Sequence, residues 1–250
     1  MTRFFISQSQ IPSLGEFCLD GENGRHGAKV LRLRPGEEVV LCDGECGEWL
    51  CTVKENQGER LLLLITGSAK SKAEPDMHIT LCQCLPKGDK LETVTQKAVE
   101  LGAYEIWPVV SRYCVTKWDA KTEARKLARL QKISLEAAMQ SGRGIVPKVL
   151  APAALEDALR SASARGDLAF LYEKATRPFY EGIRGLSSRV FVFVGPEGGF
   201  APEEAALAQE LGARMLSLGP RILRTETAAI AALSGIALDP MFVPEGYCAD

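Results

Sequence analysis

The sequence contains few of the residues that build metal sites or disulfide frameworks. Its 250 residues include only two histidines, and its eight cysteines form no C-x-x-C pair. Zinc sites usually combine closely spaced cysteines with paired histidines. Cys42, Cys46 and Cys51 come nearest to such spacing, but they fall within an apolar strand pattern. We therefore expect no metal site, and we interpret the cysteines as reduced, buried thiols of a cytoplasmic protein.

Long apolar runs and a strong charge imbalance are also missing. No window reaches the roughly eighteen consecutive apolar residues of a transmembrane helix. Residues 1–10 do not have the pattern of a signal peptide. Hydrophobic residues make up 46% of the chain, charged residues 25%, and the net charge is −2. This composition is typical of a globular protein of one large or two modest domains, with no membrane partner.

Three common catalytic fingerprints are absent. There is no G-x-x-x-x-G-K-[ST] motif of a nucleotide-binding P-loop, and no G-x-G-x-x-G follows an early strand. A G-x-S-x-G motif, which marks the nucleophile of many hydrolases, is missing as well. These absences argue against a P-loop nucleotidase, a dinucleotide-binding Rossmann enzyme and a serine hydrolase.

The first part of the chain has the pattern of a small β domain. Short apolar runs at 4–6, 29–34, 38–42, 49–53 and 60–66 predict five strands, separated by turn residues and without a convincing helix. Such a pattern favours a small barrel or sandwich. Residues 67–75 are small and polar and indicate a linker. We therefore expect one domain over 1–72 and another over 73–250.

The second part alternates between strands and helices. Strands are predicted at 78–85, 105–110, 168–172, 190–194 and 215–218, and helices at 89–101, 119–141, 155–164, 202–211 and 225–238. This alternation predicts a parallel α/β sheet whose functional site lies at the carboxyl ends of the strands.

Positive charge is concentrated in one stretch of this second part. Residues 86–148 contain 12 Lys and Arg against 7 Asp and Glu. Such a cluster can bind phosphates even in a mildly acidic protein. A solvated helix face explains the same charges equally well.

Two glycine-containing segments connect a predicted strand to a predicted helix late in the chain. The first is Gly-Pro-Glu-Gly-Gly-Phe at 195–200, and the second is Leu-Gly-Pro-Arg-Ile-Leu-Arg-Thr-Glu-Thr at 218–227. Closely spaced glycines let a backbone approach a ligand and present its N–H and C=O groups. Thr225 is the expected N-cap of the following helix. These segments locate the expected binding site.

The order and spacing of these two segments resemble those of the bacterial 16S rRNA uridine-N3 methyltransferase family (ribosomal small subunit methyltransferase E), of the SPOUT class. Residues 26–44, 87–114 and 132–147 are also similar to segments of this family. The resemblance implies a PUA-like RNA-binding β-barrel followed by an α/β domain with a C-terminal trefoil knot. It also implies a homodimer, the cofactor S-adenosylmethionine (SAM), and 16S rRNA of the small ribosomal subunit as the substrate.

The resemblance further implies which residues bind the cofactor. Carried over by position, the set comprises Leu171, Gly195, Glu197, Gly199, Leu218, Ile222, Leu223, Thr225 and Thr227. The expected RNA contacts are His26, Arg32, Lys87, Arg112 and Arg143. For each of these, a purely structural role is the competing interpretation.

The chemistry of uridine methylation suggests further roles. N3 becomes nucleophilic when it loses its proton, and a cation near O2 or O4 stabilises the resulting charge. Arg224 is the candidate for that cation, while Glu197 and Glu226 compete as the proton acceptor. Because N3 lies on the Watson–Crick edge, the target uridine must be unpaired or flipped out.

Two alternative functions are compatible with the sequence. A knotted methyltransferase acting on tRNA or 23S rRNA fits the same motifs. A non-catalytic RNA-binding protein would use the glycine segments only as turns.

The last helix is apolar nearly all round, so it is the expected dimer interface, with Ile230 and Leu233 as the positions to test.

Overall fold

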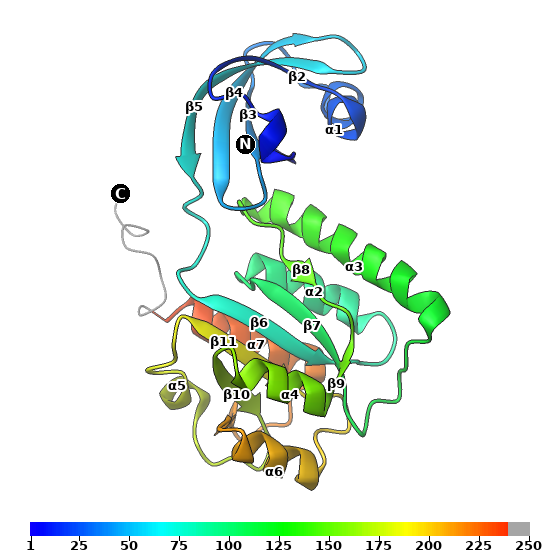
Figure 1. Ribbon diagram of the computed structural model, residues 1–250, viewed down its shortest axis with the longest axis vertical. Coiled ribbons are helices and arrows are strands. Elements are labelled where there is room, and N and C mark those ends of the chain that lie inside the picture. The colour runs from blue at the N-terminus through cyan, green and yellow to red at the C-terminus, as the bar shows by residue number, and fades with distance from the viewer. Residues whose placement is uncertain (240–250) are drawn as a thin grey trace. The chain divides into compact units, whose positions relative to one another are not determined.

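The computed structural model describes residues 1–239, which form two compact units (Figure 1). The first unit contains Met1–Glu74 and Ala138–Val146, and the second contains Pro75–Ala137 and the described residues from Pro147 onward. Within 1–239, no helix combines the length and apolar character needed to cross a membrane. The same residues contain no group of three or more His, Cys, Asp or Glu side chains suited to hold a metal ion.

The first unit is built around a five-stranded sheet. Its order is β1 (Thr2–Phe5), β3 (Glu38–Cys42), β4 (Gly47–Asn56), β5 (Leu61–Lys70) and β2 (Gly15–Leu19). The β1–β3 pair is parallel and the others are antiparallel. Register shifts between β4 and β5 mark bulges, which increase the local twist of a sheet. A one-turn 3-10 helix, η1 (Gln8–Gln10), precedes β2.

One expected strand of this unit is wrong. Residues 29–34 do not form a strand; helix α1 (Gly21–Arg25) and the π-helical segment η2 (His26–Val30) precede a bend instead. Gly24 allows α1 to lie close to the end of β2, because a Cβ at this position would lie 2.4 Å from the carbonyl oxygen of Leu19. The Asn56 side chain donates to the carbonyls of Ala28 and Leu33 and holds the end of the segment. These tertiary contacts override the local alternation of apolar residues.

The sheet is also more extensive than the sequence pattern indicates. Strand β2 is not expected from the sequence, yet it pairs along β5. Strand β5 continues to Lys70, into the expected linker, because the long strand β4 offers pairing partners as far as Gly47. The polar, small residues at 67–75 therefore predict too long a linker, because residues 67–70 are hydrogen-bonded strand.

The second unit contains a parallel sheet, as predicted. Its order is β12 (Arg214–Leu216), β10 (Asp167–Leu171), β11 (Arg189–Val194), β6 (His78–Cys84), β7 (Glu105–Val110) and β8 (Lys148–Val149), and β9 (Ala153–Ala154) also pairs with β7. All these pairings are parallel.

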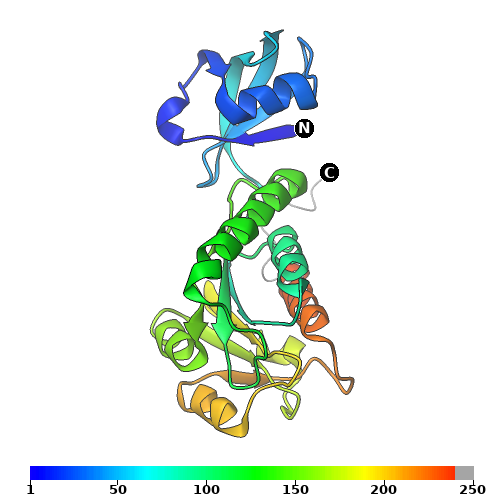
Figure 2. The ribbon, with the colours of Figure 1, turned by 90° about the vertical axis from the view of Figure 1, so that its right-hand side faces the viewer.

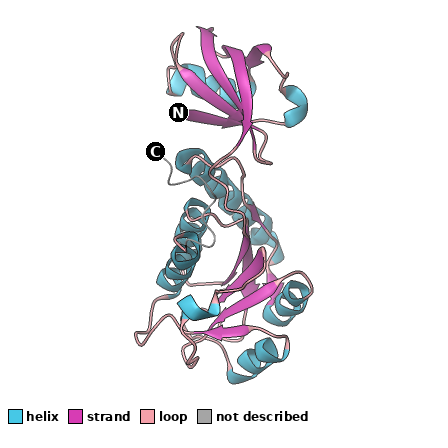
Figure 3. Cartoon of the chain, turned by 90° about the vertical axis from the view of Figure 1, so that its left-hand side faces the viewer, coloured by secondary structure: helices cyan, strands magenta, loops and turns pink. Residues whose placement is uncertain are grey.

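Helices cover both faces of this sheet. They are α2 (Lys90–Glu100), α3 (Ala120–Ser141), α4 (Leu155–Ser163), α5 (Phe179–Gly182), α6 (Pro202–Glu210) and α7 (Thr225–Ala237). Helices α2 and α7 pack together on one face, and α4 and α6 on the other (Figures 2 and 3). This double cover explains the nearly continuous apolar runs of β6 and β11. The core includes Phe170, whose ring centroid lies 4.1 Å from that of Phe200.

The thiols of the described chain are not paired in disulfides. Five of the seven described cysteines are buried, whereas Cys18 is exposed and Cys46 is partly exposed. Cys248 lies outside the described residues. The prediction of buried thiols is therefore correct for most, but not all, of the described cysteines.

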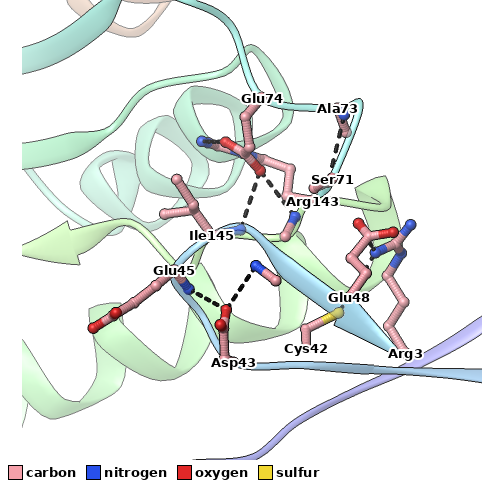
Figure 4. Close-up of polar contacts among 12 residues, drawn as sticks. Arg3, Cys42, Asp43, Glu45, Glu48, Ser71, Ala73, Glu74, Arg143 and Ile145 are labelled. Carbon is pink, nitrogen blue, oxygen red and sulfur yellow. Dashed lines mark hydrogen bonds and ion pairs between the residues drawn. The ribbon is translucent and has the colours of Figure 1, made fainter. Parts of the chain in front are cut away.

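A buried ion pair joins two segments of the first unit that are distant in the sequence. Nη2 of Arg143 lies 2.5 Å from Oε2 of Glu74, and the two side chains are 3% and 8% exposed. Glu74 also accepts hydrogen bonds from the backbone N–H groups of Gly144 and Ile145 (Figure 4). These contacts fasten the segment after α3 to the residues that follow β5. Arg143 is thus enclosed in the fold and does not present its guanidinium to solvent.

Candidate active site

Three loops at the carboxyl ends of neighbouring strands surround a cavity of about 1030 Å³ in the second unit. They follow β10, β11 and β12, which are adjacent in the sheet. The apolar wall includes Leu171, Val194 and Phe200, and the loops contribute backbone groups and charged side chains. Its volume is at the upper end of the range of small-molecule pockets, roughly 300–1,000 Å³.

The loop after β11 depends on a glycine conformation. Gly199 has φ +70°, in the left-handed region, and its N–H donates to the carbonyl of Pro196 at 2.9 Å. A Cβ at this position would point toward the Glu173 carboxylate, 3.4 Å away. A residue with a side chain would therefore be strained and would also project toward a cavity-lining group.

Thr225 joins two of the three loops. Its hydroxyl donates to the carbonyl of Gly195 at 2.6 Å and accepts from Nε2 of Gln83 at 2.9 Å. The expected N-cap role of Thr225 is wrong, because Arg224 occupies the N-cap position and Thr225 is the first helical residue. The hydroxyl bonds across the sheet instead of capping its own helix.

A lysine between two carboxylates forms a second connection. Nζ of Lys90 lies 2.8 Å from Oε1 of Glu197 and 3.5 Å from Oε2 of Glu226. The backbone N–H of Lys87 also donates to Glu197, at 3.1 Å. Burial alone would raise the pKa of Glu197, but the hydrogen bonds from Lys90 and from backbone N–H groups lower it below its ordinary value. Glu197 is thereby held in its ionised form.

Most of the expected cofactor residues lie together around the cavity. The lining includes Leu171, Gly195, Glu197, Gly199, Leu218, Ile222, Leu223 and Thr225, together with Arg224. Thr227 and Glu226, although described, are not part of the lining. Arg224 is exposed, so its guanidinium is accessible at the edge of the cavity.

The resemblance implies that the residues following the strand at Leu171 line the pocket, but it names none of them and does not indicate Tyr180 or Lys90. Glu173 and Tyr180 line the cavity from the loop after β10 and from α5, and Lys90 supports it from α2. The signal for Glu173 was its position directly after a predicted strand of a parallel sheet. The Lys90 contact has no local signal, because its partners are distant in the sequence.

The expected RNA contacts lie in different environments. Arg32 is exposed with φ +53°, and His26 is partly buried. Lys87 and Arg112 are exposed, but Arg112 forms an ion pair with Glu203. Arg143 is buried against Glu74, which makes it unsuitable as a direct phosphate contact.

Many of the lysine and arginine side chains in residues 86–148 form ion pairs with glutamates. Besides the pairs already described, Arg129 pairs with Glu92 and Lys132 with Glu136. Trp118 packs beneath Lys126, whose Nζ lies 5.3 Å from the ring centroid. Part of the stretch is therefore a paired helix surface rather than a free cationic patch.

Comparison with known families identifies the chain. A family described as the RNA methyltransferase domain matches residues 73–237, and the RNA methyltransferase PUA domain matches residues 19–66. The chain belongs to the RNA methyltransferase family. This confirms the resemblance seen in the sequence, and with it an α/β domain preceded by a PUA-like β domain.

Named relatives cover nearly the whole chain. A ribosomal RNA small subunit methyltransferase E of Bacillus subtilis is 32% identical and spans 95% of this chain and 96% of its own length. Its namesake in Mycobacterium bovis is 32% identical over 91% and 88%. The crystal structure of a ribosomal RNA small subunit methyltransferase E from Neisseria gonorrhoeae, bound to SAM, has a TM-score of 0.85 at 32% identity, over 94% and 96%.

Proposed function

We propose that this protein transfers a methyl group from SAM to N3 of a specific uridine in 16S rRNA of the small ribosomal subunit. The single observation that carries the proposal is the cavity formed by the three loops after β10, β11 and β12. The relatives named ribosomal RNA small subunit methyltransferase E, one of them bound to SAM, support the choice of cofactor and substrate.

The residues around the cavity fit SAM. Apolar side chains such as Leu171 and Leu216 suit one face of an adenine ring, and the glycine loops offer backbone donors and acceptors. Gly199, in the left-handed conformation, keeps the loop free of a side chain that would point toward Glu173. The Glu173 carboxylate adds negative charge, which suits a cationic ligand.

When bound, SAM supplies a methyl group carried on a positively charged sulfur. Arg224 is suited to the negative charge that develops on O2 or O4 as the N3 proton passes to solvent, because a guanidinium stays charged at any working pH. Glu197 is a poor proton acceptor, since its pKa is lowered, and Glu226 lies outside the lining. We therefore assign positioning roles to both carboxylates and the charge-stabilising role to Arg224.

RNA contacts are proposed at His26 and Arg32 of the first unit and, separately, at Lys87 and Arg112 of the second. Three of these four side chains are exposed, and all but His26 are lysine or arginine, the residue types that contact phosphates. Arg143 is omitted because it is buried. A flipped uridine would have to enter the cavity to bring its N3 near Arg224.

The assembly and topology are proposals of the same kind. After β12, at the edge of the sheet, the chain returns so that α7 packs against α2 and β11. This return past the loop after β11 supports a trefoil knot.

The proposed homodimer interface includes Ile230, which is partly exposed. It does not include Leu233, because that side chain is only 1% exposed within its own chain. We expect the protein to act in the cytoplasm, where the ribosome is assembled.

Methyl mapping tests the proposal. The protein is incubated with SAM and unmodified total rRNA, and methylated nucleotides are located. We expect N3-methyluridine at one position of 16S rRNA. Methylation only in tRNA or 23S rRNA would contradict the substrate assignment. Failure to bind SAM in calorimetry would instead favour a non-catalytic RNA-binding protein.

A further inference from the structure

Lys90 connects three segments that are far apart in the chain. It is the first residue of α2, and its Nζ lies 2.8 Å from Glu197 in the loop after β11 and 3.5 Å from Glu226 in the first turn of α7. All three side chains are only 21–30% exposed. The Lys90–Glu197 contact spans 107 residues of sequence.

The arrangement places two carboxylates beside one cation. Without Lys90, Glu197 and Glu226 would be like charges in a partly buried position, where water screens their repulsion only in part. The repulsion would act on the loop after β11 and on the start of α7. Thr225, next to Glu226, bonds to Gly195 of the same loop, so the two connections lie side by side.

We propose that Lys90 is a positioning residue, which holds the loop after β11 and the start of α7 in the arrangement that forms the cofactor cavity. It acts through Glu197 and Glu226 and touches neither the methyl group nor the RNA. This proposal rests on the proposed function, because the ligand expected in the cavity is SAM. It also removes Lys90 from the basic residues available for phosphates.

The test compares SAM affinity by calorimetry in matched variants of the full chain. Lys90→Met keeps most of the hydrocarbon stem and removes the charge, and we expect SAM to bind about tenfold more weakly. Lys97→Met is the control on the same helix, since Lys97 pairs with Glu100 instead. Its affinity should stay within about twofold of wild type.

A charge rescue separates positioning from simple packing. In the double variant Lys90→Met/Glu226→Gln, one of the two facing carboxylates is neutral, and we expect most of the SAM affinity to return. Lys90→Arg, which keeps the charge, should also retain part of it. Unchanged affinity in Lys90→Met, or a loss that Glu226→Gln does not relieve, would overturn the proposal.

A second measurement keeps the inference distinct from the proposed function. Hydrogen exchange without any ligand should be faster in Lys90→Met at the amides of 195–199 and 225–228, unchanged in Lys97→Met, and slower again in the double variant. If the wild-type protein failed to bind SAM while this exchange pattern held, the proposed function would fail and the positioning role would stand. Equal exchange in all variants would refute the positioning role.

Discussion

The two units each contain an ion cluster with the same chemistry in different surroundings. In the first unit, Arg143 and Glu74 are 3% and 8% exposed, and Glu74 also accepts hydrogen bonds from neighbouring backbone N–H groups. In the second unit, Lys90, Glu197 and Glu226 are 21–30% exposed beside a large cavity. Removing one partner of a buried charge pair leaves the other charge buried without compensation, which strongly destabilises the fold. In the partly exposed Lys90 cluster, water screens the remaining charges, so removing one charge should cost less folding free energy and should mainly affect the adjoining cavity.

The largest expected effect belongs to the buried cluster. Arg143→Met leaves the Glu74 carboxylate buried without its cation, which should lower the free energy of unfolding by about 3–5 kcal/mol. Urea denaturation measures this change. Arg160→Met is the matched control, because its Glu156 pair is more than half exposed, and its loss should stay below about 0.5 kcal/mol.

The partner substitution sharpens this result. Glu74→Gln added to Arg143→Met removes the lone charge but keeps an oxygen for the N–H groups of Gly144 and Ile145. We expect the double variant to recover part of the lost stability. Similar losses in Arg143→Met and Arg160→Met would show that burial does not strengthen the Arg143–Glu74 pair relative to an exposed ion pair.

A smaller effect is expected at the cavity edge. Arg224→Ala should lower the single-turnover rate at saturating RNA and SAM by about a hundredfold, equivalent to about 3 kcal/mol, because one donor to the developing charge is lost. SAM affinity should change little, since an arginine does not attract a sulfonium. An unchanged rate together with weaker RNA binding would make Arg224 a phosphate contact instead.

A substitution of Gly199 tests whether the backbone conformation shapes the loop beside the Lys90–Glu197–Glu226 cluster. Gly199→Val places a branched side chain at φ +70°, and SAM affinity should fall at least about tenfold. Gly212→Val imposes similar strain, since Gly212 has φ +83°, but it follows α6 away from the cavity lining. Calorimetry on both folded variants distinguishes strain from loss of the site, and an equal loss in both would remove this role from Gly199.

The smallest effect concerns pH. Because the pKa of Glu197 is lower in the folded protein, its contribution to stability is complete above its ordinary pKa of about 4.5 and is lost as the pH falls through the lowered value. The difference in unfolding free energy between wild type and Glu197→Gln should therefore shrink from pH 7 to pH 4 in urea titrations. In a Lys90→Met background this dependence should weaken. A difference that grows toward acidic pH would contradict the sign of the shift.

Particular elements show how far the sequence could predict the structure. The apolar runs of β6 and β11, and the glycines flanking α6, locate these elements correctly because their signals are local. The apolar pattern of residues 29–34 predicts a strand that does not form, because tertiary hydrogen bonds from the Asn56 side chain to the carbonyls of Ala28 and Leu33 hold this segment in another conformation. The two glycine loops after predicted strands indicate where the cavity lies, and the family resemblance implies its individual residues. Arg143 was misjudged as a phosphate contact because nothing near it in the sequence indicates Glu74.

The parallel α/β class, the two glycine loops and the family can all be inferred from the amino-acid sequence. These depend on hydrophobic periodicity, on residue-specific backbone freedom and on motif order, all of which are written along the chain. Only the tertiary structure decided which charges are partners. Arg143 meets Glu74 across 69 residues, Lys90 meets Glu197 across 107, and Thr225 meets Gln83 across 142. Charge pairing and burial depend on distances in space and not on separation along the chain. The surrounding fold therefore decides whether an arginine or lysine forms a buried ion pair, positions a cavity loop or remains an exposed cation.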